Sequence, residues 1–240
     1  MEKSQINLSV VERTAEVMQS SSSRRNFLRT AGLTTAAGVA VFAVGCKKDA
    51  DMVAPASGTV DLGSGDVGVL NYAYALEQLE AAFYIQVLTT PYAGMSSAET
   101  SVLTDIRDHE IIHRDFFKAA LGANAIGGLT PDFSQIDFTS RDKVLGAAKL
   151  FEDTGVAAYN GAGKLLKDAG YLLLAGKIVS VEGRHAAAIA DLMKPMTAFF
   201  AGDDIINSNG LDAAKMPSEI LTAVQPYIKT KISGANLPTA

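Results

Sequence analysis

Residues 109–113 read HEIIH, and Glu110 and His113 within them form a Glu-x-x-His motif. A second motif of the same kind, Glu182 with His185, lies further along the chain. Residues three apart share one face of a helix, so each motif directs a carboxylate and an imidazole toward the same point. One such motif arises easily by chance, but two of them predict a pair of helices that both carry metal ligands.

A helical stretch with a glutamate and, seven residues on, a tyrosine precedes each motif. These pairs are Glu77 with Tyr84 and Glu152 with Tyr159. Four helices packed together would place four carboxylates and two imidazoles around one buried point. Mixed oxygen and nitrogen ligands suit two divalent ions of the iron or manganese type. The predicted metal ligands are Glu77, Glu110, His113, Glu152, Glu182 and His185.

With these motifs the sequence resembles the ferritin-like superfamily, and most closely the bacterial exported ferritin-like domain proteins, a group that includes desiccation-related proteins. The segment NYAYALEQLEAAFY at 71–84 is similar to the first helix of that family, and HEIIH at 109–113 to its second. The resemblance covers just over half of the chain. It implies an all-α fold, a ferritin-like four-helix bundle, with a dinuclear metal site inside it.

Apolar residues at helical spacing predict long helices at about 67–89, 97–121, 140–168 and 171–193, the last two joined by a tight turn at Ala169-Gly170. The connection at 122–139 is long, as a bundle requires if its third helix starts at the same end as its second. The expected fold is therefore a four-helix bundle with a long crossover between the second and third helices.

The first helix and the C-terminal region allow more detailed predictions. Asp66 is expected to cap the first helix. Asn71, Gln78 and Gln86 fall on one side of that helix at 100° per residue, so they are expected to face water. The segment from Pro217 to Ile228 predicts one more short helix, which would cover the bundle.

The two halves of the bundle repeat one pattern, which predicts an approximate two-fold axis through the site. Glu77 and Glu80 both fall on the apolar face of the first helix. The repeat aligns Glu77 with Glu152, and Glu80 with Gly155, which has no side chain to offer. Glu77 is therefore the predicted ligand, and Glu80 an extra carboxylate that could take a proton, bond to His109, or bind metal in one redox state.

Three further side chains are expected beside the ligands. Tyr84 and Tyr159 either pack in the core or hydrogen-bond to a ligand carboxylate. His109 is expected in the core or next to a ligand rather than as a ligand itself. Many di-iron bundles have an aspartate just before each Glu-x-x-His glutamate, which orients a histidine of the other helix. Here those positions are His109 and Val181, so the usual outer partners of the ligands are partly missing.

Residues 1–45 are predicted to be an export signal and not part of the fold. Ser22 to Leu28 resembles a twin-arginine motif. The apolar run at 31–45 is too short to span a hydrocarbon core of ~30 Å as a helix. It ends in Ala-Val-Gly-Cys, which resembles a lipoprotein cleavage box, so Cys46 would carry the lipid. The alternative is a plain signal with an incidental cysteine.

The chain therefore divides into a signal at 1–45, a flexible tether at 46–65, the bundle at 66–197 and a covering segment at 198–240. The net charge is −5, and residues 1–45 hold more basic than acidic side chains, so the remainder is more acidic still. Such a body is a poor partner for nucleic acid. The single cysteine excludes an internal disulfide. The protein is expected to be exported, to the periplasm or the cell surface, with a lipid anchor in the membrane.

The ligand set and the resemblance together favour oxidative chemistry. The expected reaction is iron oxidation, or the reaction of reduced metal with oxygen or peroxide as a small oxidant. Two divalent transition-metal ions would be the cofactors, with iron favoured over manganese. The alternative function is a structural or stress-protective bundle with no catalytic metal. The sequence leaves open which oxidase, peroxidase, catalase or oxygenase reaction applies.

Overall fold

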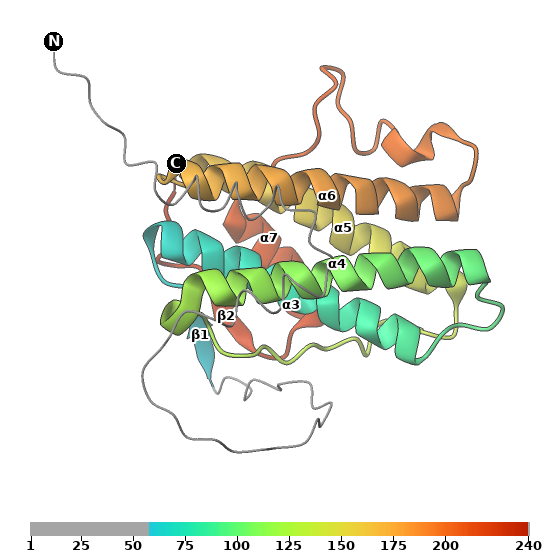
Figure 1. Cartoon of the computed structure of the whole chain (residues 1–240), viewed down its shortest axis with the longest axis horizontal. Coiled ribbons are helices and arrows are strands. Elements are labelled where there is room, and N and C mark those ends of the chain that lie inside the picture. The colour runs from blue at the N-terminus through green and yellow to red at the C-terminus, as the bar shows by residue number, and fades with distance from the viewer. Residues whose placement is uncertain (1–57, 240) are drawn as a thin grey trace, which may run out of the picture. The chain divides into compact units, whose positions relative to one another are not determined.

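The computed structural model describes residues 58–239. Four long helices lie along one another as a bundle (Figure 1). The short helix α7 (Pro217–Val224) packs beside them, and the predicted all-α bundle is confirmed. The long helices are α3 (Gly65–Thr89), α4 (Ser97–Leu121), α5 (Arg141–Ala162) and α6 (Ala169–Met193).

The helices pack as two pairs, α3 with α4 and α5 with α6, each joined by a short connection. Residues 122–140 carry the chain from the end of α4 back along the bundle to the start of α5 (Figure 1). The predicted long crossover is therefore confirmed. It lets α5 start at the same end as α4, so α5 runs antiparallel to α3 and the second helix pair runs opposite to the first.

The start of α4 shows how the sequence sets a helix boundary. The Ser96 hydroxyl accepts a hydrogen bond from the Glu99 amide at 3.1 Å, and the Glu99 carboxylate accepts one from the Ser96 amide at 2.8 Å. This reciprocal capping box satisfies two amides that the helix leaves without partners. Arg141 at the start of α5 donates to the same Glu99 at 2.6 Å, so the cap also joins α4 to α5.

Asp66 does not cap α3, so that prediction is wrong. The helix begins at Gly65 after Ser64, and Asp66 lies in its first turn. The Asp66 carboxylate instead accepts hydrogen bonds from the amides of Lys167 and Asp168, at 2.9 and 2.8 Å. The side chain therefore fixes the start of α3 to the connection between α5 and α6.

The third helix ends earlier than predicted. The α-helix α5 ends at Ala162, and a 3₁₀ turn at Gly163–Leu165 follows it. Asp168 then caps α6, because its carboxylate accepts hydrogen bonds from the amides of Gly170 and Tyr171. The predicted tight turn at residues 169–170 is therefore the first turn of α6 rather than a connection.

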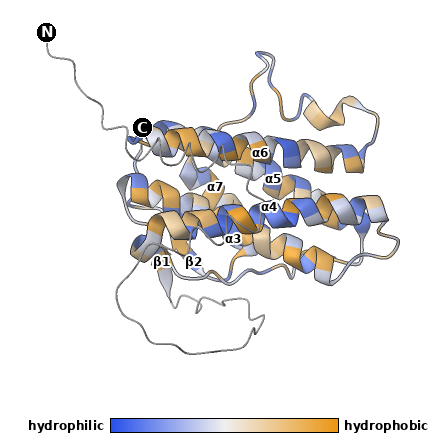
Figure 2. Ribbon diagram, viewed as in Figure 1, coloured by the Kyte–Doolittle hydropathy of each residue, from blue (hydrophilic) through white to orange (hydrophobic). Residues whose placement is uncertain are grey.

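The first long helix is buried on more sides than predicted. Figure 2 shows polar and apolar bands alternating along α4, as expected for a helix with one wet face, whereas α3 is buried along most of its length. Asn71 is only 3% exposed, so the prediction that it faces water is wrong. Its amide group donates to the carbonyls of Leu62 and Asn124 and accepts from the amide of Ile126. The crossover covers this side of α3 and forms hydrogen bonds with its polar side chains.

The C-terminal segment covers the bundle, as predicted. Ile220 and Val224 of α7 are buried in the main apolar core. Strand β2 (Lys231–Ser233) then pairs in parallel with β1 (Thr59–Asp61). Because β1 lies within the predicted flexible tether, that prediction is wrong for these three residues.

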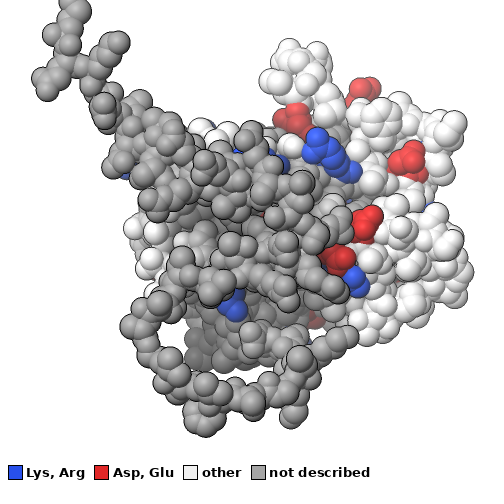
Figure 3. All heavy atoms as spheres, viewed as in Figure 1, with Lys and Arg blue, Asp and Glu red and all other residues white. Residues whose placement is uncertain are grey.

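Other predictions about the N-terminal region, including the export signal and the lipidated Cys46, lie outside the described residues. Within residues 58–239, no helix has the length and apolar character needed to cross a membrane. On the face of the molecule shown in Figure 3, the described acidic side chains lie among a few separate basic ones.

Candidate metal centre

The structure brings the six predicted ligands together in the middle of the bundle. They form two groups of four residues, and within each group the ligand atoms lie within 4.8 Å of one another. All six side chains are buried, and the four glutamates are fully so. One group is Glu77, Glu110, His113 and Glu182, and the other is Glu110, Glu152, Glu182 and His185.

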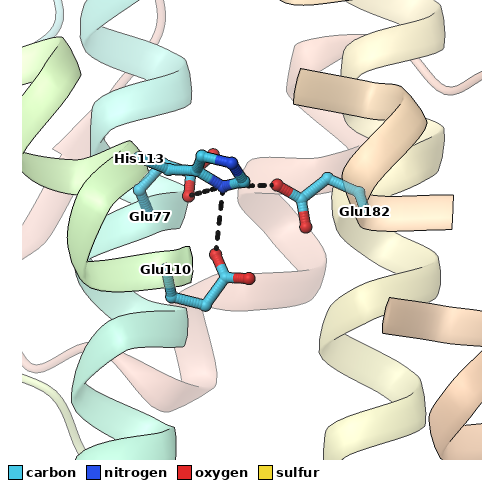
Figure 4. A group of neighbouring side chains, drawn as sticks. All are labelled: Glu77, Glu110, His113 and Glu182. Atoms are coloured by element: carbon cyan, nitrogen blue, oxygen red, sulfur yellow. Dashed lines mark ion pairs between the residues drawn. The ribbon is translucent and has the colours of Figure 1, made fainter. Parts of the chain in front are cut away.

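The first group converges on Nδ1 of His113. Figure 4 shows the carboxylates of Glu77, Glu110 and Glu182 pointing toward this nitrogen. Their nearest oxygens lie 3.4, 3.6 and 2.9 Å from it. These side chains come from α3, α4 and α6, so three helices meet at this position.

The second group converges in the same way on Nδ1 of His185. Oxygens of Glu110, Glu152 and Glu182 lie 2.8, 3.4 and 3.2 Å from it. Glu110 and Glu182 therefore belong to both groups, whereas Glu77 and Glu152 each belong to one. This is the arrangement expected of two ion positions that share two carboxylates and are related by an approximate two-fold axis.

The arrangement of the carboxylate oxygens and imidazole nitrogens suits the binding of cations better than hydrogen bonding among themselves. Five buried carboxylate oxygens and Nδ1 of His113 have no hydrogen-bond partner of acceptable geometry, although several lie close together. Unpartnered buried polar atoms are rare and destabilising, so such a concentration requires an explanation. Two divalent ions would satisfy these atoms at once. The oxygens are Oε2 of Glu77, both of Glu110, Oε2 of Glu152 and Oε1 of Glu182.

The carboxyl groups of the centre differ in proton affinity. Burial raises the pKa of Glu77 well above its usual range. Burial also raises the pKa of Glu152, to about 8, although the neighbouring His185 opposes the rise. Burial alone would raise the pKa of Glu110 too, but contacts with His113 and His185 lower it to about 2. Without metal, Glu77 and Glu152 therefore hold protons at neutral pH.

The two histidines hold protons as well when no metal is bound. Burial alone would lower the pKa of His113, but its three carboxylate neighbours raise it to about 12. The same balance raises the pKa of His185 to about 12. In the metal-free protein, the two imidazolium cations therefore neutralise the carboxylates, which is the role that two metal cations would otherwise have. Metal binding must therefore displace protons from both imidazoles.

The two tyrosines of the repeated pattern hydrogen-bond to ligand carboxylates. The Tyr84 hydroxyl donates to Oε1 of Glu152 at 2.6 Å. The Tyr159 hydroxyl donates to Oε1 of Glu77. Each tyrosine therefore contacts the glutamate of the other half, so the two hydrogen bonds run between α3 and α5 in opposite directions. Of the two alternatives that the sequence left open, the structure shows the hydrogen bond.

Glu80 lies beside the centre but belongs to neither group. It is 3% exposed, and a Cβ atom at Gly155 would come within 3.0 Å of its Oε1. The missing side chain at Gly155 therefore leaves the space that the Glu80 carboxyl occupies. Burial and the neighbouring carboxylates raise the pKa of Glu80 well above its usual range, so it is a neutral acid in the metal-free protein.

His109 lies next to a predicted ligand, but it is not a core residue. Its side chain is exposed, and its Nδ1 lies 3.0 Å from Nε2 of His185. No hydrogen bond joins it to Glu80 in the described part of the chain. Helical periodicity placed His109 on the inward side of α4, whereas it lies at the margin of that side, where α4 faces α6.

A small apolar cavity of about 30 Å³ lies near the centre, among all four long helices. Tyr159 lines it and also donates to Glu77, so this side chain contacts both the cavity and a predicted ligand. The cavity was not predictable from the sequence, because alanines form much of its wall and alanine is common throughout this chain. Its lining includes Tyr72, Ala73, Phe117, Ala158, Tyr159 and Ala162.

A comparison with family models matches residues 65–195 to the family described as Ferritin-like domain. The match spans more than half of the chain and contains every predicted metal ligand. The chain belongs to this family. A search of curated proteins found no match to this ferritin-like protein. The buried glutamate and histidine side chains of this ferritin-like domain could hold metal ions.

Proposed function

We propose that this ferritin-like protein binds two iron ions between its four long helices and carries out oxidative chemistry there, with manganese as the alternative metal. The observation that supports the proposal is the cluster of two imidazoles and four carboxylates, whose unpartnered oxygens point inward from all four helices. Four ionised carboxylates balance the charge of two divalent ions, whereas the metal-free protein holds protons on Glu77, Glu152 and both imidazoles instead.

The two shared carboxylates and the two outer ones have different roles in this proposal. Glu110 and Glu182 would contribute to holding both ions, because each belongs to both groups. Glu77 and Glu152 would each hold one ion, and their hydrogen bonds from Tyr159 and Tyr84 fix their orientation. Bound reduced ions would supply electrons to an oxidant and polarise it. The apolar core around the site keeps bulk water away from these groups.

The apolar cavity favours dioxygen over peroxide as the oxidant. The cavity has a volume of about 30 Å³. One water molecule needs about 10–15 Å³ when volume is measured in the same way. The cavity therefore has room for a diatomic gas but not for a large organic substrate. Apolar cavities of this kind do not hold polar molecules well, because they offer no hydrogen-bond partners. We propose that dioxygen reaches the centre through this cavity, past Tyr159.

We also propose that the protein is exported and lipid-anchored through Cys46, at the periplasm or the cell surface. The support is the sequence alone: the twin-arginine-like motif, the short apolar run and the cysteine placed after Ala-Val-Gly. The variant Cys46→Ala should move the protein from the membrane fraction to the soluble fraction. Unchanged membrane retention of the variant would refute the anchor.

The decisive experiment is metal analysis of the mature protein purified from its native export route, followed by reaction of the reduced form with dioxygen. The proposal expects about two transition-metal ions per chain. It also expects oxidation of the bound iron faster than that of ferrous ion in the same buffer. A metal-free protein that folds normally would refute the proposal and favour a structural or stress-protective bundle. Metal binding without faster oxidation of the bound iron would refute the oxidative function and show that the protein only binds metal.

A further inference from the structure

One difference between the two halves of the metal centre is a contact between two histidines. His109 immediately precedes Glu110 on α4, and its Nδ1 lies 3.0 Å from Nε2 of His185 on α6. The two rings are nearly parallel, at 9°, with their centroids 5.2 Å apart. Val181 occupies the equivalent position before Glu182, and an aliphatic side chain offers His113 no hydrogen bond. Among residues 58–239, no hydrogen bond reaches Nε2 of His113.

This contact bears on metal binding because both histidines face the carboxylates through Nδ1. A neutral imidazole that binds metal through Nδ1 carries its proton on Nε2. Nε2–H of His185 can then donate to Nδ1 of His109, which fixes the tautomer and the ring orientation of His185. His113 has no such partner at Nε2 among residues 58–239, so its ring is oriented only by packing, by solvent and by the groups at Nδ1.

We infer that the two metal positions are unequal, and that His109 is the positioning residue that makes them so. The position that includes His185 binds its ion first and more tightly. The position that includes His113 binds second and exchanges its ion more readily. Outer partners of ligand histidines change metal affinity by about 10–100-fold, which is enough to separate two binding steps. The inference rests on the proposed metal centre but not on its oxidative activity.

The first test is a calorimetric titration of the metal-free full chain with Co²⁺ or Mn²⁺ under anaerobic conditions. The wild type should bind two ions in two resolved steps. His109→Ala should weaken the tighter step by about tenfold or more and leave the weaker step nearly unchanged. His109→Asn, whose amide oxygen can accept the same hydrogen bond, should restore most of the difference.

The matched substitutions lie at the equivalent position of α6. Val181→Ala removes apolar volume without supplying a partner and should leave both steps unchanged. Val181→Asp supplies an acceptor near His113 and should tighten the weaker step, so the two steps converge. Two equal steps in the wild type, or a His109→Ala variant that weakens both steps equally, would overturn the inference. A wild type that binds no metal would refute the proposed metal centre itself.

A spectroscopic measurement distinguishes positioning from a general effect on folding. In the proton NMR spectrum of the Co²⁺-loaded protein, each ligand histidine contributes one exchangeable Nε2–H signal. The signal of His185 should exchange slowly because His109 accepts its hydrogen bond, and that of His113 should exchange fast. His109→Ala should make both fast, whereas His109→Asn should keep one slow. Slow exchange that survives His109→Ala would contradict the assigned role.

Discussion

The hydroxyl of Tyr84 on α3 donates a 2.6 Å hydrogen bond to Oε1 of Glu152 on α5. Tyr159 on α5 makes the equivalent contact with Glu77 on α3. Residues 75 positions apart in the chain therefore exchange equivalent partners across the axis of the bundle. The contacts join the two helix pairs at the candidate metal centre.

The crossed tyrosines should act on different metal positions. Tyr84→Phe removes the partner of Glu152 and should weaken mainly the position that includes His185. Tyr159→Phe removes the partner of Glu77 and should weaken mainly the position that includes His113. Each variant should also lower the free energy of unfolding of the metal-free protein by about 1 kcal/mol, since one buried hydrogen bond is lost. Metal titration and urea unfolding measure the two effects. Loss of the same step in both variants would show that the contacts are not crossed in solution.

The shared carboxylates should matter more for metal content than the outer ones. Glu110→Ala and Glu182→Ala should each lose most of both ions, because each side chain belongs to both groups. Glu152→Ala should lose about one ion and keep the other. Elemental analysis of the purified variants measures the content. Asp108→Ala, at an exposed neighbour of the same helix, provides the control and should keep both ions. Full occupancy in Glu110→Ala and Glu182→Ala would refute the assignment.

Glu77 and Glu80 should differ although both are buried on α3. Glu77→Ala should remove one ion or weaken both, because Glu77 faces His113 at 3.4 Å. Glu80→Ala should keep both ions while altering reactivity, and Glu80→Gln should do so without opening the space beside Gly155. If the Glu80 variants lose metal and Glu77→Ala does not, the two-fold argument that chose Glu77 is wrong.

The clustering of the six predicted ligands was predictable from the sequence, because their spacing follows local rules. Glu110 and His113 share a helix face by spacing alone, and α4 begins and ends at the predicted residues. The choice of Glu77 over Glu80 needed only the internal repeat and Gly155. In the structure Glu77 belongs to one of the two groups of ligand-type side chains and Glu80 to neither, and the variants above test the choice.

The remaining features depend on contacts between distant segments. Asn71 looked like a surface residue, and it is buried because the crossover returns over α3. Strand β1 has three residues and exists through pairing with β2 near the other end of the chain. Helical periodicity placed His109 on the inward side but did not reveal its contact with His185 on a different helix. Periodicity describes one helix at a time, so it does not predict which helix supplies the partner.

The metal-free protein should lose stability as pH rises above about 5. The pKa of Glu152 is about 8 in the fold, well above the usual value of 4.5, so folding favours its protonated form. That contribution is present below pH 4.5 and is lost as pH rises toward 8. His113 and His185 also lower the stability as pH rises above 6.5. Their pKa values are raised in the folded state, so above pH 6.5 the folded protein holds protons that the unfolded chain has lost. Urea unfolding from pH 5 to 9 measures the trend.

Two comparisons test the cause of this pH dependence. Glu152→Gln cannot ionise, so its stability should fall less steeply with pH than that of the wild type. The metal-loaded protein should show the opposite trend at the same pH values, because protons compete with metal for the ligands and binding strengthens as pH rises. A metal-free wild type whose stability rises from pH 5 to 9 would contradict the proton assignment.

The apolar cavity is the proposed route by which dioxygen reaches the metal ions. Ala162 lines the cavity, so Ala162→Leu should fill much of its small volume. The variant should keep both metal ions, and its reduced iron form should react with dioxygen several-fold more slowly than the wild type. Its reaction with peroxide should change little, because peroxide does not need an apolar route. Xenon pressed into crystals of the wild type should occupy the cavity, and it should be absent from the variant.

Ala187→Leu is the matched control, because Ala187 lines a separate cavity of about 190 Å³ beside Phe199, away from Tyr159. An Ala162→Leu variant with unchanged dioxygen kinetics and no bound xenon would show that the gas reaches the centre by another path.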